Sequence, residues 1–86
     1  MGLDGVELVL ACESDFGIVI PDAHAAELRT PRMLADYISQ ALTADNRARP
    51  SGEVLLRILQ LTSRQLSIPT DKIHPDHDFV KDLGLD

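Results

Sequence analysis

Two histidines and two aspartates near the end of the chain are the side chains best suited to hold a metal ion. His74, Asp76, His77 and Asp78 fall within a stretch of five residues, and imidazole and carboxylate groups are common metal ligands. No distant residue completes a metal site, and the surrounding sequence predicts a loop. We therefore interpret this cluster as part of a solvated loop, with weak attraction of divalent cations through net charge alone.

Acidic residues follow one side of the first predicted helix. Asp4, Glu7, Glu13 and Asp15 are left on the faces that its apolar residues do not occupy. Such a pattern is typical of a solvated surface, and acids are favourable near a helix N-terminus.

Patterns that would indicate an enzyme do not occur. The sequence has no Ser/His/Asp triad, no paired carboxylates of a catalytic cleft, no glycine-rich phosphate loop and no Cys/His zinc pattern. We therefore expect a protein that is not an enzyme.

Apolar residues recur at steps of three and four from Leu3 to Phe16 and predict an amphipathic helix. Gly17 can take the left-handed conformation that ends such a helix. The predicted buried face consists of Leu3, Val6, Val9, Leu10, Cys12 and Phe16.

Two further helices are predicted before the middle of the chain. Asp22 is a suitable cap for a short helix over residues 23–28. Thr30 and Pro31 supply a hydroxyl cap and a proline at the first helical position. The helix that follows has an apolar face comprising Met33, Leu34, Tyr37, Ile38, Ala41 and Leu42.

The second half of the chain begins with a polar linker, residues 43–52, which contains proline and glycine but no large apolar residue. Fully extended, it would span about 30 Å. A strongly periodic helix follows over residues 53–66, with Arg57, Gln60 and Arg64 as a polar stripe. Its predicted buried side consists of Val54, Leu55, Ile58, Leu59, Leu61 and Leu66.

Residues 70–86 read as a long loop held down by a few apolar anchors. The anchors are Ile73, Phe79, Val80, Leu83 and Leu85. Three main helices, one short helix and a long loop predict an all-α bundle in a single domain.

Composition excludes several classes of protein. The chain has 86 residues, with 14 acidic and 8 basic side chains and a formal charge of -6. This acidic balance disfavours a nucleic-acid binder, because phosphate contacts need clustered lysine and arginine. No apolar run approaches the roughly 20 residues of a membrane span, and no basic leader begins the chain. With Cys12 as its one cysteine, we expect a cytoplasmic protein in a reducing setting.

The two halves of the chain resemble the two halves of an acyl carrier protein, in reversed order. The run from Val54 to Asp86, which ends in Asp-Leu-Gly-Leu-Asp, resembles that family's first helix, its long loop and the motif that leads to its modified serine. The run from Leu3 to Leu42, with Val-Glu-Leu-Val-Leu-Ala-Cys-Glu-Ser-Asp-Phe-Gly at residues 6–17, resembles the family's second half.

This order implies a circularly permuted four-helix acyl-carrier-like bundle in one domain. Residues 1–42 would supply the family's second half, residues 53–86 its first half, and the linker 43–52 would join its old termini. The joining is geometrically reasonable, because neighbouring antiparallel helices need only a short connection. The resemblance also assigns Cys12 to the core, as an inert apolar residue.

Members of the family carry 4'-phosphopantetheine on the serine of an Asp-Ser-Leu motif, and the thiol of that arm holds acyl chains during fatty acid or polyketide synthesis. The resemblance places Asp86 beside Gly2 and Leu3, which rebuilds the motif as Asp-Gly-Leu without a hydroxyl. We therefore expect no 4'-phosphopantetheine on this chain. No other serine follows an aspartate and precedes a leucine at a helix start, which applies to Ser14, Ser39 and Ser51.

The resemblance also suggests partners. In the family, the helix after the modified serine is recognised by basic patches of synthases and transferases, so Asp4, Glu7, Glu13 and Asp15 are candidate partner contacts as well as a solvated face. Two alternatives stay open: a working carrier with an unusual attachment, and a protein-binding module that uses the acidic helix without lipid chemistry. A monomer is expected, and a dimer with exchanged halves is the alternative.

Overall fold

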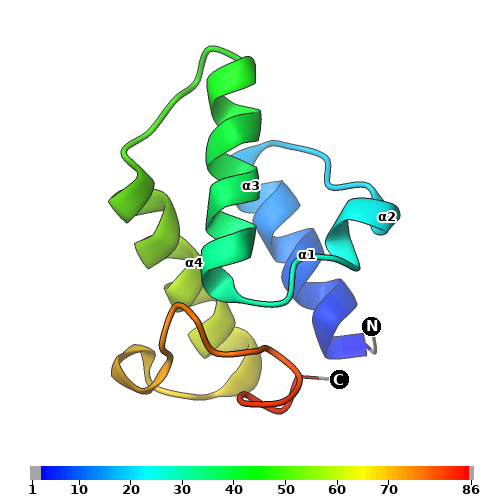
Figure 1. Cartoon of the computed structure of the whole chain (residues 1–86), viewed down its shortest axis with the longest axis vertical. Helices are drawn as coiled ribbons and strands as arrows, with labels where there is room; N and C mark the ends of the chain where they lie inside the picture. The colour runs from blue at the N-terminus through cyan, green and yellow to red at the C-terminus, as the bar shows by residue number, and fades with distance from the viewer. Residues whose placement is uncertain (1–2, 86) are drawn as a thin grey trace.

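The computed structural model describes residues 3–85, with side chains described from Gly5 onward, and it is helical (Figure 1). The helices are α1 (Leu3–Phe16), α2 (Asp22–Ala25), α3 (Pro31–Ala44) and α4 (Ser51–Leu66), followed by one 3₁₀ turn, η1 (Thr70–Lys72). No strand occurs in this range. The prediction of an all-α bundle with three main helices and one short helix is confirmed.

Local sequence signals place two of the helix boundaries correctly. Gly17 ends α1 in the left-handed region with φ at 66°, and the Glu13 carbonyl accepts the N–H groups of Gly17 and Ile18. Thr30 caps α3, because its hydroxyl accepts the N–H of Met33 at 3.1 Å while Pro31 occupies the first helical position.

The short helix differs from its prediction. α2 covers Asp22–Ala25 instead of residues 23–28, and Pro21 stands at its cap position without a side-chain hydrogen bond. Asp22 lies in the first turn, so it faces the positive end of the short helix without capping it.

The linker is shorter than predicted, and it contacts the end of α1. α3 continues to Ala44 and α4 begins at Ser51, which leaves only residues 45–50 between them. Arg47 donates hydrogen bonds to the carbonyl oxygens of Phe16 at 3.0 Å and Gly17 at 2.8 Å, and the guanidinium of Arg49 lies 5.5 Å from the centre of the Phe16 ring. The linker therefore satisfies carbonyls at the end of α1, which has no basic residue in its own last turn.

One hydrophobic core joins both halves of the chain. α4 packs against both α3 and α1, and the tail after α4 runs beneath the lower ends of the helices (Figure 1). The first half supplies Leu8, Cys12, Phe16, Ile20, Ala25, Leu34, Ala35, Ile38 and Leu42, and the second half supplies Val54, Ile58, Leu61, Phe79 and Leu85.

The buried face of α1 is rotated from its prediction. Val6 and Leu10 were expected in the core, yet they are 46% and 56% exposed, while Leu8 is buried. The stretch around these residues is apolar on several sides, so its periodicity alone does not select a face. The packing of α1 against α4 selects the buried face. This face contains Leu8, Cys12 and Phe16, at steps of four.

The contact between α1 and α4 includes an ion pair that connects the two halves. Arg57 donates to both carboxylate oxygens of Asp15, at 2.6 and 2.9 Å. This bidentate hydrogen bonding holds the pKa of Asp15 below its usual value. The sequence had suggested only that Arg57 belongs to a solvated polar stripe. In the structure, it also binds Asp15.

Two neighbouring residues of the tail behave differently. Phe79 is buried as predicted, but Val80, also predicted to be an anchor, is 58% exposed. The tail turns around Phe79, whose N–H donates to the Arg29 carbonyl and whose carbonyl accepts the N–H of Leu85. This turn directs the ring inward and leaves the side chain of Val80 in solvent.

Candidate functional site

An apolar cavity of about 220 Å³ lies where the start of α1 meets the end of the tail. From α1, it is lined by Gly5, Leu8 and Val9, and from the tail by Phe79 and Leu85 among others. The first turn of α1 and the last described residues of the tail are therefore neighbours in space. In Figure 1 the blue start of α1 and the red end of the tail lie at the same end of the bundle.

The other walls come from the α2–α3 region. Ala25, Ala26, Leu28 and Leu34 contribute apolar surface. The charged residues that line the cavity are Arg29, Asp78 and Lys81.

Asp78 has its hydrogen bonds satisfied locally. Its carboxylate accepts the N–H groups of Lys81 and Val80, at 2.8 and 2.9 Å, which lowers its pKa. This carboxylate closes a turn of the tail and is held in its charged form, so it is not suited to act as a general acid at neutral pH.

No hydroxyl or thiol is found among the described residues that line this cavity. The residues available there are apolar, cationic or, at Asp78, an already bonded carboxylate. The cavity can accommodate an apolar group, but its described lining offers no hydroxyl or thiol for ester or thioester formation.

The predicted attachment residues lie at the edge of what can be described. Gly2 and Asp86 fall outside the described residues, as do the side chains of Leu3 and Asp4. The backbone of Leu3 begins α1. The nearby residues Gly5 and Leu85 both line the cavity, so the structure brings the flanks of the predicted motif together.

Gly5 is a candidate site residue that the sequence prediction missed. A repeated triplet could have indicated it, because Gly2-Leu3-Asp4 has the same three residues as Gly84-Leu85-Asp86. Gly5 directly follows the first triplet, is buried in the first turns of α1 and lines the cavity.

The acidic residues of α1 do not gather on one free face. Glu7 accepts a hydrogen bond from the Gln65 amide of α4 at 2.7 Å. Asp15 forms an ion pair with Arg57, which is also on α4. Glu13 turns the other way and accepts the N–H of Ile20 at 2.9 Å. Among the described acids of α1, each therefore already has an intramolecular partner.

A second, more open groove runs between α1 and the segment that leads into α2. Its volume is about 580 Å³, and its apolar lining includes the exposed residues Val6, Leu10 and Val19, with Glu13 and Asp22 as acidic members. The sequence prediction missed this apolar surface, because it placed Val6 and Leu10 in the core.

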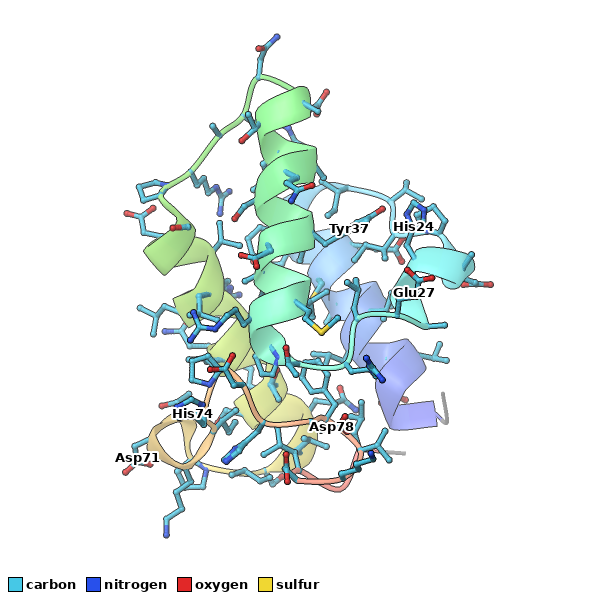
Figure 2. All side chains as sticks on the ribbon, in the orientation of Figure 1. His24, Glu27, Tyr37, Asp71, His74 and Asp78 are labelled. Atoms are coloured by element: carbon cyan, nitrogen blue, oxygen red, sulfur yellow. The ribbon has the colours of Figure 1, made fainter. Side chains whose placement is uncertain are left out.

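The end of α2 forms part of the wall of both cavities through Ala25 and the residue after the helix, Ala26. The ring of His24 contacts the ring of Tyr37 on α3 edge to face, and its Nδ1 lies 2.9 Å from the Tyr37 hydroxyl. Figure 2 shows this pair between the two helices, with Glu27 at the far end of the same segment. One side-chain pair therefore links α2 to α3.

The histidine and aspartate cluster of the tail forms a hydrogen-bonded turn. Among the described side chains, those of residues 5–85, no three His, Cys, Asp or Glu groups are arranged to hold a metal ion. His74 and His77 instead accept main-chain hydrogen bonds. Within residues 3–85, no helix is both long and apolar enough to cross a membrane.

Comparison with known proteins finds similarity to an acyl carrier protein. The chain is similar to the acyl carrier protein of Thermosynechococcus vestitus, with 43% identity over 42 residues. The match covers 49% of this chain and 52% of the relative, so the chain spans about half the length of the curated relative it matches. No family model matches the chain, and no solved structure matches it.

This similarity supports the resemblance to acyl carrier proteins. The helical bundle is consistent with the fold that the resemblance implied. The relative is named as a carrier protein, in agreement with the expectation that this chain is not an enzyme.

Proposed function

We propose that the chain is a circularly permuted domain of the acyl carrier type that presents an apolar cavity at the seam between its two halves. One observation carries this proposal: Gly5 and Leu8, from the segment that resembles the family's second half, line the same cavity as Phe79 and Leu85, from the segment that resembles its first half. Two segments in reversed order would share a cavity in this way if they formed one domain of the family.

We further propose that the chain carries no 4'-phosphopantetheine. The arm is attached through a phosphodiester to a serine hydroxyl, and the described lining of the cavity provides no hydroxyl. Two alignments of the motif are available, since either Asp86 or Asp4 can stand for the aspartate before the serine. The first alignment puts Gly2 in the serine position, followed by Leu3, and the second puts Gly5 there, followed by Val6 instead of leucine. Glycine occupies the serine position in both.

Restoring the hydroxyl is expected to make the domain chargeable. Wild-type protein incubated with a phosphopantetheinyl transferase and coenzyme A should keep its mass, because glycine has no nucleophilic oxygen. Gly5→Ser or Gly2→Ser should gain the mass of one arm in intact-protein mass spectrometry. Which of the two gains it identifies the correct alignment of the motif.

Gly52→Ser is the matched control, since it adds the same hydroxyl to an exposed position in the first turn of α4, away from the cavity. It should stay uncharged. An arm on the wild-type chain would overturn the proposal that it carries none. If neither Gly2→Ser nor Gly5→Ser accepts an arm, this result would count against a carrier site where the two halves of the chain meet.

We also propose that the groove beside α1 binds a basic surface of a synthase or transferase. Its exposed apolar residues Val6, Leu10 and Val19 offer contact area next to the carboxylates of Glu13 and Asp22. Apolar contacts supply affinity, and complementary charge supplies orientation and association rate. Asp15 contributes less, because Arg57 already neutralises it.

Reversing the charge of Glu13 and Asp22, the two acids of this groove, is expected to weaken capture by a phosphopantetheinyl transferase at least about tenfold, because like charges then oppose each other. The measurement is an equilibrium titration of the Glu13→Lys/Asp22→Lys variant. Asp36→Lys/Glu53→Lys makes the same change in net charge at exposed positions of α3 and α4 and should retain most of the affinity. Equal losses in both variants would mean that net charge, and not this groove, governs binding.

We propose a monomeric, cytoplasmic protein. The contacts of Arg47 and Arg49 with the end of α1 support the monomer, since they hold the linker against its own chain. Exchange of halves between two chains would need this linker to detach and extend.

A further inference from the structure

A turn of the tail is closed by two histidine side chains that accept main-chain hydrogen bonds. Nδ1 of His77 accepts the N–H of His74 at 3.0 Å, and Nδ1 of His74 accepts the N–H of Asp76 at 3.0 Å. The N–H of His77 in turn donates to the carbonyl of His74. The two imidazole rings lie 5.6 Å apart, and we call residues 74–77 the histidine turn.

Both imidazole bonds require a neutral ring. A ring nitrogen that accepts a hydrogen bond must carry its lone pair, so the proton of each neutral imidazole is on Nε2. Protonation places a hydrogen on Nδ1 as well, and two donors then face each other. Histidine changes its charge between pH 5 and 8, so mild acid is expected to break both bonds.

The histidine turn joins the tail to the start of α3. The carbonyl of Pro75 accepts the N–H of Arg32 at 2.9 Å, which satisfies an otherwise unpaired group in the first turn of a helix. The Arg32 side chain donates to Asp76 at 2.7 Å and thereby lowers the pKa of that carboxyl. The Asp76 carboxylate therefore stays charged over the range in which histidine titrates.

A charged His74 would compete for the same carboxylate. Its Nδ1 lies 3.8 Å from an oxygen of Asp76, so an imidazolium there would attract Asp76 away from Arg32. The charged groups carried by the turn and by the elements around it are Arg32 and Asp36 on α3, Asp71 and Lys72 on η1, and Asp76, Asp78, Lys81 and Asp82 on the tail. Figure 2 shows His74 and Asp71 on the same side of the tail, with Asp78 apart from them.

The histidine turn leads directly into the cavity wall. Residues 78–81 follow it and line the cavity described above. A change in the conformation of the histidine turn would therefore be transmitted to the cavity wall by the backbone of the adjoining residues.

We propose that the histidine turn is a proton-sensitive contact. It keeps the tail bound to α3 while both imidazoles are neutral, and it weakens this binding in mild acid. It couples acidity to the mobility of the cavity wall. It does not depend on whether the chain carries a prosthetic arm.

Nuclear magnetic resonance of the wild-type chain at pH 7.5 and 5.5 tests the proposal. At pH 7.5 the ring nitrogen shifts of His74 and His77 should report Nε2–H tautomers. At pH 5.5 the protection of the His74 and Asp76 amides against exchange, relative to an unstructured peptide at the same pH, should fall roughly two- to tenfold. Nδ1–H tautomers at pH 7.5, or equal protection at both pH values, would overturn the proposal.

The double variant His74→Asn/His77→Asn separates titration from structure. Asparagine supplies an amide oxygen that can accept the same bonds but does not titrate, so protection should become independent of pH. His24→Asn is the control, because the Tyr37 hydroxyl beside His24 can donate to a neutral ring or accept from a charged one, and this variant should keep the wild-type response. If the response is lost in the control or kept in the double variant, the proton acts elsewhere.

Discussion

Replacing Phe79 by alanine is expected to lower the free energy of unfolding by about 3–5 kcal/mol, the range for large-to-small changes at buried aromatic residues. Phe79 belongs to the tail but is only 4% exposed and lies in the common core. It also borders the 220 Å³ cavity, so the space left by its ring would add to an existing void. Small domains have a total stability of about 5–15 kcal/mol, which makes this loss a large fraction.

Urea denaturation followed by circular dichroism measures this effect. The neighbouring change Val80→Ala is the control, since Val80 is 58% exposed and surface substitutions usually stay within about 0.5 kcal/mol. A loss below about 1 kcal/mol for Phe79→Ala would mean that the tail is not part of the cooperative fold. A variant too unstable to purify would agree with the prediction only if Val80→Ala purifies normally.

Cys12 is expected to react at least about a thousandfold more slowly with a thiol reagent in the folded protein than in the unfolded chain. Its side chain is inaccessible, and burial, with the nearby charge of Asp15 as a smaller cause, raises its pKa to about 12. An unperturbed cysteine titrates near about 8.5, so the thiolate that reacts is depleted by about three orders of magnitude at neutral pH. Steric exclusion slows the reaction further.

The rate of colour release from a disulfide reagent at pH 8 measures this reactivity, with and without concentrated guanidinium chloride. Ser14→Cys provides an internal control, because it adds an exposed thiol to the same helix. That variant should show one fast and one slow reaction. Two fast reactions in the folded protein would contradict the burial of Cys12.

Helix boundaries with a local chemical cause could be predicted from the sequence. Thr30 and Pro31 start α3, and Gly17 ends α1, through contacts with residues only a few positions away. Features that depend on distant residues could not. Asp15 meets Arg57, and Phe16 meets Arg47, across wide separations along the chain, and neither pairing leaves a periodic signal.

The orientation of apolar residues was predictable only where one face was clearly more apolar. α4 buries Val54, Ile58 and Leu61 as its pattern indicated. In α1, apolar residues occupy several faces, and the direction of Val6 and Leu10 depends on where the neighbouring elements lie. In the tail, both Phe79 and Val80 were suitable anchors, and the backbone turn selected the aromatic ring.

The candidate site could be predicted only in outline. The resemblance suggested a meeting of the two chain segments, and Gly5 and Leu85 line one cavity. The cavity itself was not predictable, because empty space is a result of how α1, the α2–α3 region and the tail pack together. The acids of α1 were expected to act together, but their directions depend on Gln65, Arg57 and the backbone of Ile20.

The arginines of residues 45–50 limit how freely this connection could vary. A spacer chosen only for its length would still let α3 and α4 lie antiparallel. It would, however, leave the Phe16 and Gly17 carbonyls without the hydrogen bonds from the guanidinium of Arg47. The segment that joins α3 to α4 thus acts as an integral brace of the bundle, and a glycine-serine replacement of equal length would not be equivalent to it.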